Sequence, residues 1–276
     1  VKKPVDFGFL DFTTLEKRSF YCFEEVRLNR RLSPDVYAGV VEIREEKGHY
    51  TVDGPGRTVE YAVKMRRLPQ ERTLAALLSQ GRVGEEEVRR VAQKIWAFHQ
   101  HAEVGQEITR LGGLEAVRLN TAENFSQARP FISHTITPEE YDRARAFTEA
   151  FLEVKEPLFR RREQEGWVRD THGDLHAQQV FLTNDIEVID CIEFNQRFRY
   201  QDVANDLAFT AMDLDSFGRH DLSQALVQEY ISRSGDQDLR EVLDFFKAYR
   251  AFVRGKVESF RIEALSPSDP ARQEAE

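Results

Sequence analysis

The sequence is poor in cysteine, with only Cys22 and Cys191 among its 276 residues. Two cysteines cannot build the disulfide framework of a small secreted domain or a cysteine-rich zinc site. The N-terminal stretch VKKPVDFGFLDF also lacks the pattern of a signal peptide. We therefore interpret both cysteines as buried thiols in a reducing compartment, which predicts a cytoplasmic protein.

Long apolar runs and an excess of positive charge are also absent. No apolar run approaches the roughly 18 residues that are needed to span a bilayer. The formal net charge is -9, whereas general binding of nucleic acid requires a basic face. We expect neither a membrane nor a nucleic acid among the partners. The acidic charge favours a cationic substrate only weakly, because acidic soluble proteins are common.

The glycine motifs that bind phosphate are missing. No GxxxxGK[ST] loop occurs, because Gly255-Lys256 lacks both the upstream glycine and the following hydroxyl residue. The sequence starts without Met and as if inside an element, so we expect a fragment or a processed form. Its length suits one large domain or two lobes with a sizeable core.

Two kinds of section follow one another along the chain. Residues 13–32 have helical spacing with Thr14 as the N-cap, and the expected apolar face comprises Phe20, Phe23, Val26 and Leu28. Two strand-like stretches, VYAGVVEI and VEYAVKM, flank the turn-rich KGHYTVDGPGR. The pattern then becomes mostly helical. We predict an α+β fold, with a small strand-containing section over 1–69 and a mainly helical section over 70–265.

The helical section contains further expected elements. PEEYDRARAFTEAFLEVKEPLFRRREQEG is predicted to be one long helix with Pro138 in its first turn. Two short strands, QVFLT and EVIDC, flank a turn at Asn184-Asp185. The polar residues 266–276 are predicted to be a disordered tail. Four aromatic residues are expected in the core rather than against a ligand, namely Trp96, Phe245, Phe246 and Tyr249.

The stretch THGDLHAQQVF, residues 171–181, admits three interpretations. His172 and His176 are four residues apart, as zinc ligands on a helix require, but Gly173 and Asp174 are poor helix residues and no third ligand is apparent. The stretch can also be an ordinary polar loop. The third interpretation is a site of phosphoryl transfer.

Phosphoryl transfer needs three groups that occur here in the required order. A first carboxylate, Asp174, would accept the proton of an attacking hydroxyl. The amide of Gln179 and the carboxylate of Asp190 follow at the ends of the two short strands. Both supply the hard oxygen atoms that Mg2+ prefers.

Together with DVANDLAF and FKAYRAFVRGKV, these motifs resemble the aminoglycoside phosphotransferase-like family over nearly the whole chain. The resemblance implies a protein-kinase-like fold, with a small N-lobe that is truncated at its start and a mainly helical C-lobe. It also implies transfer of the γ-phosphoryl group of ATP, with Mg2+, to a hydroxyl of a small molecule. The identity of that acceptor is not implied.

The resemblance assigns roles to individual residues. Asp174 matches the catalytic base, and His172 matches the residue that braces the catalytic loop. Asp190 matches the principal magnesium ligand, whereas Gln179 stands where the family usually has Asn. Because Gln is one methylene longer than Asn, we expect coordination through water or compensation by Glu193.

The nucleotide side of the resemblance requires a lysine that pairs with a helix glutamate. Glu25 is the better match for that glutamate than Glu24. The lysine is expected at Lys3 or Lys2, or upstream of Val1, and Lys3 precedes a proline in a way that suits a strand end. The glycine-rich hairpin that should precede this lysine is absent from the sequence.

The connection between the two lobes is expected at residues 63–67. Lys64 resembles the lysine of a VAIK-type motif, but it follows the helix and therefore has the wrong order. We interpret Lys64 as a strand residue. The backbone of Met65 and Arg66 is then expected to lie against adenine.

A second function is consistent with these departures. Gln179 and the missing hairpin also suit a catalytically degenerate kinase-like domain that binds nucleotide or a partner. The subgroup that this chain resembles includes longer proteins with a P-loop ATPase half. A partner domain of that kind is therefore expected to be missing here.

Overall fold

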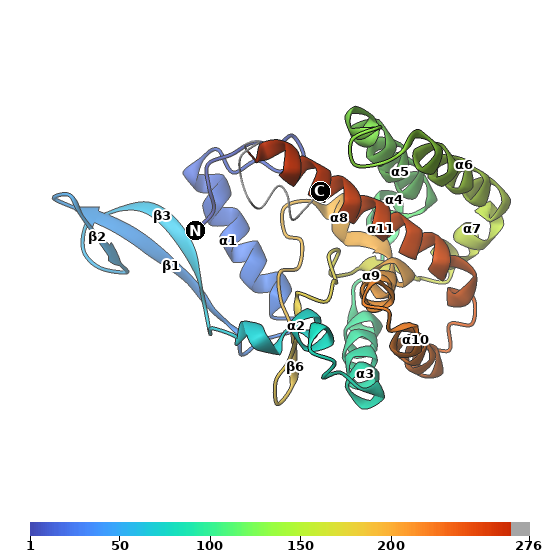
Figure 1. Ribbon diagram of the computed structural model, residues 1–276. Coiled ribbons are helices and arrows are strands. Elements are labelled where there is room, and N and C mark those ends of the chain that lie inside the picture. The colour runs from blue at the N-terminus through green and yellow to red at the C-terminus, as the bar shows by residue number, and fades with distance from the viewer. Residues whose placement is uncertain (266–276) are drawn as a thin grey trace.

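The computed structural model describes residues 1–265, and the expected tail 266–276 lies outside them. An N-terminal segment leads into helix α1 (Leu15–Asn29) and then into strands β1 (Tyr37–Glu46), β2 (His49–Val52) and β3 (Arg57–Met65). The strands form an antiparallel sheet in the order β2-β1-β3. Helix α1 lies between this sheet and a larger helical part (Figure 1). The predicted α+β fold is confirmed.

Strand β2 was not expected, because its residues fall in the segment predicted to be a turn. Lys47 and Gly48 have positive φ angles of 52° and 82°, which are the values of a two-residue hairpin turn with the twist of its flanking strands. The hairpin sets the register that pairs Glu46 with His49 and Ile43 with Val52. All four residues of β2 are exposed, so no apolar alternation marks this strand in the sequence.

Helix α1 begins as predicted, and Val26 and Leu28 of the expected apolar face are buried, but the rest of its buried face differs. The Thr14 side chain caps it by accepting from the Lys17 N–H. Phe20 and Phe23, expected on the apolar face, are 59% and 58% exposed. The buried face comprises Arg18, Cys22, Val26, Leu28 and Asn29. Polar Arg18 is tolerated there because its guanidinium donates to Glu60 and to the carbonyl of Phe12.

In the described residues, ten α-helices and two short 3-10 helices follow β3 and build the helical part (Figure 1). They are the 3-10 turn Gln70–Arg72, α2 (Leu74–Ser79), α3 (Glu85–His101), α4 (Gln106–Gly112), α5 (Leu114–Ala128), the 3-10 turn Arg129–Phe131, α6 (Pro138–Val154), α7 (Glu156–Gln164), α8 (Gln196–Arg199), α9 (Val203–Ser216), α10 (His220–Ser234) and α11 (Leu239–Ala264). None of these described helices is both long enough and apolar enough to cross a membrane.

The single long helix predicted from Pro138 is wrong. Helix α6 ends at Val154, and α7 begins after Lys155 with a proline in its first turn. Pro157 lacks a backbone N–H, and its ring would clash with the carbonyl one turn earlier in a continuous helix. The charged periodicity continues across the break, which is why the sequence pattern reads as one helix.

Two small strand pairs hold the segment that contains the conspicuous histidines. The predicted pair is present as β5 (Val180–Leu182) and β6 (Ile186–Val188). A second pair, β4 (Val168–Asp170) with β7 (Tyr200–Asp202), was not predicted. Each of its strands has only three residues, which is too short for a recognisable alternation of apolar and polar side chains.

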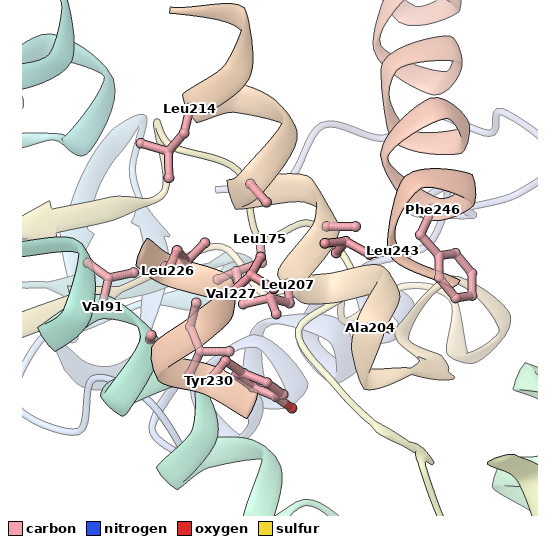
Figure 2. Packing of buried hydrophobic residues seen from close by; sticks show 14 of the residues in the cluster. Val91, Leu175, Ala204, Leu207, Leu214, Leu226, Val227, Tyr230, Leu243 and Phe246 are labelled. Atoms are coloured by element: carbon pink, nitrogen blue, oxygen red, sulfur yellow. The ribbon is translucent and has the colours of Figure 1, made fainter. Parts of the chain in front are cut away.

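The core lies where α9 is enclosed by α3, α10 and α11 (Figure 2). Leu207 of α9, Leu226 and Tyr230 of α10 and Phe246 of α11 are at most 1% exposed. Full burial of such side chains stabilises the fold by about 1.5–3 kcal/mol each. The predicted burial of Phe245 and Phe246 is confirmed.

A buried ion cluster ties α7 to this core. Arg162 is fully buried and donates to both carboxylate oxygens of Asp202, at 2.7 and 2.9 Å, and of Asp236, at 2.7 and 2.8 Å. The ion cluster joins α7, the start of α9 and the turn before α11. The neighbouring Arg161 is exposed and pairs with Asp238.

Candidate functional site

A carboxylate of α9 anchors the loop that follows β4. Asp206 is fully buried and accepts from the backbone N–H of His172 at 2.8 Å and of Gly173 at 2.9 Å. Burial opposes its charge, but the hydrogen bond from His99 and the nearby Arg250 guanidinium hold the pKa of Asp206 at about 2. Asp206 is therefore an ionised anchor for this loop. The resemblance carried by DVANDLAF implies the same structural role for this aspartate.

His172 braces the same loop from within. Its Nδ1 accepts from the backbone N–H of Asp174 at 3.2 Å, so its Nε2 carries the proton and donates to the carbonyl of Ile189 at 2.9 Å. Its own carbonyl accepts from the N–H of Ile192 at 3.1 Å. Burial lowers the pKa of His172, so the ring is neutral. His172 is a positioning residue that locks residues 172–174 against residues 189–192.

Gly173 is the residue that lets the loop approach its neighbour closely. Its φ is 88°, which L side chains rarely adopt, and a Cβ atom there would lie 2.9 Å from the carbonyl oxygen of Phe198. The tight turn at Gly173 brings Asp174 to the wall of a cavity, which its side chain lines.

Asp174 is half-buried and faces His176, whose Nε2 lies 3.5 Å from its carboxylate. Burial would raise the pKa of Asp174, but His176 and the charge of Arg250 outweigh burial and lower it. Asp174 is thus an ionised carboxylate beside a cavity, which suits a group that orients a hydroxyl and accepts its proton.

The zinc interpretation of His172 and His176 does not fit this geometry. Both ring nitrogens of His172 are engaged by the backbone of Asp174 and Ile189, so neither has a lone pair for a metal. Within residues 1–265, no three His, Cys, Asp or Glu side chains gather as metal ligands. The two histidines have separate structural roles instead.

The structure brings Gln179 and Asp190 together at the ends of β5 and β6. The Gln179 Nε2 donates to the Asp190 Oδ2 at 2.8 Å, and the Ile189 N–H donates to the Gln179 carbonyl at 3.1 Å. Asp190 is exposed and has a φ of 67°. Its N–H donates to the hydroxyl of Tyr37 at 3.1 Å, which fixes this conformation.

These two side chains fit a partial set of magnesium ligands. Mg2+ usually keeps several waters and takes one or two carboxylates together with substrate phosphates. One exposed carboxylate and one amide meet that need if the amide rotates to present its oxygen. Cys191, next to Asp190, is buried, and burial raises its pKa to about 12, so it is an inert thiol.

The lysine that meets Glu25 is Lys2, not Lys3. The Lys2 Nζ lies 2.8 Å from the Glu25 carboxylate and also contacts the carboxylate of Glu193. Burial disfavours its charge, but Glu193 and Glu25 outweigh burial and raise the pKa of Lys2. Lys3 is exposed. Of the two lysines expected to pair with this glutamate, Lys2 reaches it and Lys3 does not, because neighbouring residues of an extended segment point to opposite sides.

Two other glutamates were considered for this site, namely Glu24 and Glu193. Glu24 pairs with Arg27 at 2.7 Å, whereas Lys2 pairs with Glu25 and Glu193. Glu193, expected to assist at the magnesium site, is engaged by Lys2. Burial raises the pKa of Glu193 above its usual range. Lys2 thus connects α1 to the segment that follows Asp190.

Met65 and Arg66, which are expected to lie against adenine, are only partly available to bind a base. The Arg66 N–H donates to the carbonyl of Val36 at 2.8 Å, and its guanidinium pairs with Glu187 at 2.8 Å. Arg66 therefore cannot offer that N–H to a base in this conformation. Met65 is 38% exposed at the end of β3. Lys64 is an exposed strand residue, as expected from its order.

A cavity of about 340 Å3 lies beside Asp174 and was not foreseen from the sequence. It is enclosed by α5, α11, residues 192–201 and Phe9 of the N-terminal segment. Its polar lining includes Asn120, Glu123, Arg197 and Lys256. These residues are scattered over 137 positions of the sequence and share no motif. Packing of α11 against α5 and the ion pair of Arg197 of α8 with Glu123 bring them together.

Comparison with known proteins finds relatives that are themselves uncharacterized. No family model matches it. Uncharacterized proteins of Mycobacterium tuberculosis and Mycobacterium bovis are 34% identical to it over 271 residues, which is 98% of this chain and 53% of each relative. The chain spans about half the length of the curated relatives that it matches.

Proposed function

We propose that this protein is an ATP-dependent phosphotransferase that moves the γ-phosphoryl group to a hydroxyl of a small molecule. The observation that carries the proposal is the pair of hydrogen bonds between His172 and the segment on either side of Asp190: the His172 Nε2 donates to the Ile189 carbonyl, and the Ile192 N–H donates to the His172 carbonyl. They set the loop of Asp174 beside Asp190. His172 thereby links the segment of the expected base to the segment of the expected magnesium ligand.

The proposal includes a two-lobed, protein-kinase-like arrangement. The small lobe would be residues 1–69, with the sheet and α1, and the helical lobe would be residues 70–265. Lys2 supports this arrangement, because it joins Glu25 of the small lobe to Glu193 of the helical lobe. A cytoplasmic location is part of the proposal, since Cys22 and Cys191 are both buried, unpaired thiols.

The residues of the chain would act mainly by positioning and by neutralising charge. Bound Mg·ATP would supply the phosphoryl group and the charge that compensates it. Lys2, oriented by Glu25, would hold phosphate oxygens. Asp190 and Gln179 would hold the ion. Asp174 would orient the acceptor hydroxyl and accept its proton as the new bond forms.

Calorimetric titration of Mg·ATP tests the nucleotide site. We expect Lys2→Met and Asp190→Asn to abolish measurable binding, and Lys3→Met to leave it unchanged. Asn is the preferred substitution at Asp190 because, unlike Ala, it tolerates the positive φ of 67°. Equal binding by the Lys2→Met and Lys3→Met variants would contradict the proposed site.

A degenerate kinase-like domain is the second candidate function. Two observations favour it, namely the amide nitrogen of Gln179 facing Asp190 and the engaged N–H of Arg66. Such a domain would bind nucleotide or a partner domain, for instance a P-loop ATPase half, without turnover. Asp174→Asn separates the candidates, because it would abolish acceptor-dependent ADP release by an enzyme but leave the binding of a non-enzyme intact.

A further inference from the structure

The cavity beside Asp174 has a charge pattern opposite to that of the whole chain. Five charged side chains line it, namely Asp174, Glu123, Arg197, Arg250 and Lys256. The chain carries a net charge of -9, whereas this lining has three cations and two carboxylates. The partners of each cation decide which charge is available to a ligand.

Two of the three cations are already committed. Arg197 pairs with both oxygens of Glu123, at 3.0 and 2.7 Å. Arg250 is buried and donates to the amide oxygens of Asn205 and Gln201, at 2.8 and 2.7 Å. Arg250 cannot change partners without leaving a buried acceptor unsatisfied, and the charge of Arg197 is balanced by Glu123.

Lys256 of α11 is the cation whose charge is not balanced. Its Nζ donates to the amide oxygens of Asn124, at 2.6 Å, and Gln127, at 2.7 Å, and it has no carboxylate within ion-pair distance in the described residues. Two neutral acceptors orient the ammonium and leave its third N–H for a ligand. Burial lowers the pKa of Lys256, with Glu123 the charge that opposes this.

Asn120 supplies a second polar contact on the same face of α5 as Asn124. Its Oδ1 is buried without a hydrogen-bond partner and is the only such side-chain atom in residues 1–265. A buried acceptor left unpaired costs about 1–3 kcal/mol, so a ligand donor here would be favourable. Residues four apart on a helix are about 6 Å apart along its axis, which sets the spacing of the two contacts.

The remaining walls of the cavity are apolar and largely aromatic. They include Phe9, Ile192, Phe198, Val253, Val257 and Phe260. Phe9 also contacts Phe198, with ring centroids 6.2 Å apart, and its carbonyl accepts from Asn195 at 3.1 Å. An apolar body of the ligand would remove these side chains from water.

We infer that the acceptor is a hydroxylated monoanion with an apolar body, bound through its carboxylate to Lys256 and through a hydroxyl or N–H to Asn120. This inference rests on the proposed function, since it takes the cavity beside Asp174 as the acceptor site. An acceptor of this class is opposite in charge to the aminoglycosides. It is also opposite to the cationic substrate that the net charge weakly favours.

Two small probes with the same hydroxyphenyl body test the charge preference. We would titrate 3-(4-hydroxyphenyl)propionate and tyramine into the unaltered chain, without nucleotide, and measure dissociation constants by ligand-observed NMR. The anion is expected to bind about tenfold more tightly than the cation, which corresponds to about 1.4 kcal/mol. Equal binding, tighter binding of tyramine or binding of neither probe would overturn the inference.

Variants of α11 locate the contact. Lys256→Gln should weaken the anionic probe about tenfold, whereas Lys256→Arg should keep the preference. Lys247→Gln is the matched control, because Lys247 lies on the same helix but pairs with Asp215 outside the cavity. An equal effect of Lys256→Gln and Lys247→Gln would overturn the assignment. Because no nucleotide is present, failure of Mg·ATP binding would leave this comparison intact.

Discussion

The carboxylate of Asp206 accepts the backbone N–H of His172 at 2.8 Å, although 34 residues separate the two along the chain. The same carboxylate accepts from Gly173, Gln201 and His99. A single buried charge therefore fixes the loop that presents Asp174. The conformation of this loop depends on α9 as much as on its own sequence.

Replacing Asp206 by Asn should destabilise the protein by about 3 kcal/mol, because a buried amide N–H2 would face a backbone N–H that loses its acceptor. Urea unfolding would measure the loss. Asp244→Asn is the control, since Asp244 is an exposed residue of α11, and it should change stability by less than about 0.5 kcal/mol. Equal stability of the two variants would contradict the anchoring role of Asp206.

Arg162→Met should cost about 3–5 kcal/mol, because it leaves the carboxylates of Asp202 and Asp236 buried without their cation. Arg161→Met removes the next residue along α7, which forms an exposed pair with Asp238, and should cost at most about 1 kcal/mol. Chemical denaturation of both variants provides the comparison. A loss of similar size from each would show that burial of the ion cluster is unimportant.

Stability should fall as the pH drops below about 6.5, and His172 should cause part of this fall. Burial lowers the pKa of His172 in the folded chain, despite the nearby carboxylates of Asp206 and Asp174. The unfolded chain therefore binds more protons than the folded chain below the ordinary histidine value, and its stability rises with pH in that range. Thermal unfolding between pH 5 and pH 8 would measure the slope.

The contribution of His172 can be separated from that of other histidines. His172→Gln should reduce the slope, whereas His134→Gln should leave it unchanged, because His134 is exposed. An unaltered slope in the His172→Gln variant would contradict the neutral, buried ring. Circular dichroism at pH 8 would establish that both variants are folded before the comparison.

Gln179→Glu should make the stability of the protein depend on Mg2+. Without the ion, a second carboxylate beside Asp190 replaces the hydrogen bond of 2.8 Å by repulsion, and Tm should fall by about 2–4 °C. Added MgCl2 should restore Tm, because the two carboxylates then share a cation. Gln178→Glu is the control, because it adds the same charge at the exposed neighbouring residue. An identical response of the two variants to MgCl2 would count against a magnesium site.

Part of the candidate site's geometry could be predicted from the order of residues in the sequence. The pairing of β5 and β6 was predicted from two apolar runs around a turn, and this pairing alone brings Gln179 to Asp190. The positions of Asp174 and His172 follow from the same short segment. Local elements fix such contacts because few residues separate the partners.

Other contacts had no local signal. The choice of Lys2 over Lys3 depends on which side of the N-terminal segment faces Glu25 and Glu193. The inner face of α1 carries Arg18 and Asn29 in place of the expected Phe20 and Phe23. Apolar periodicity predicts the buried face of a helix because polar side chains without hydrogen-bond partners remain at the surface. Arg18 and Asn29 can be buried because their partners lie elsewhere in the chain.

The sequence by itself determined the division into a strand-containing section and a helical section, because hydrophobic spacing and turn residues act over short distances. It also determined the order of Asp174, Gln179 and Asp190. The tertiary structure alone decided that Lys2 joins α1 to Glu193 and that Lys256 faces a cavity with Asn120. These contacts join distant segments, so they exist only after the helices have packed.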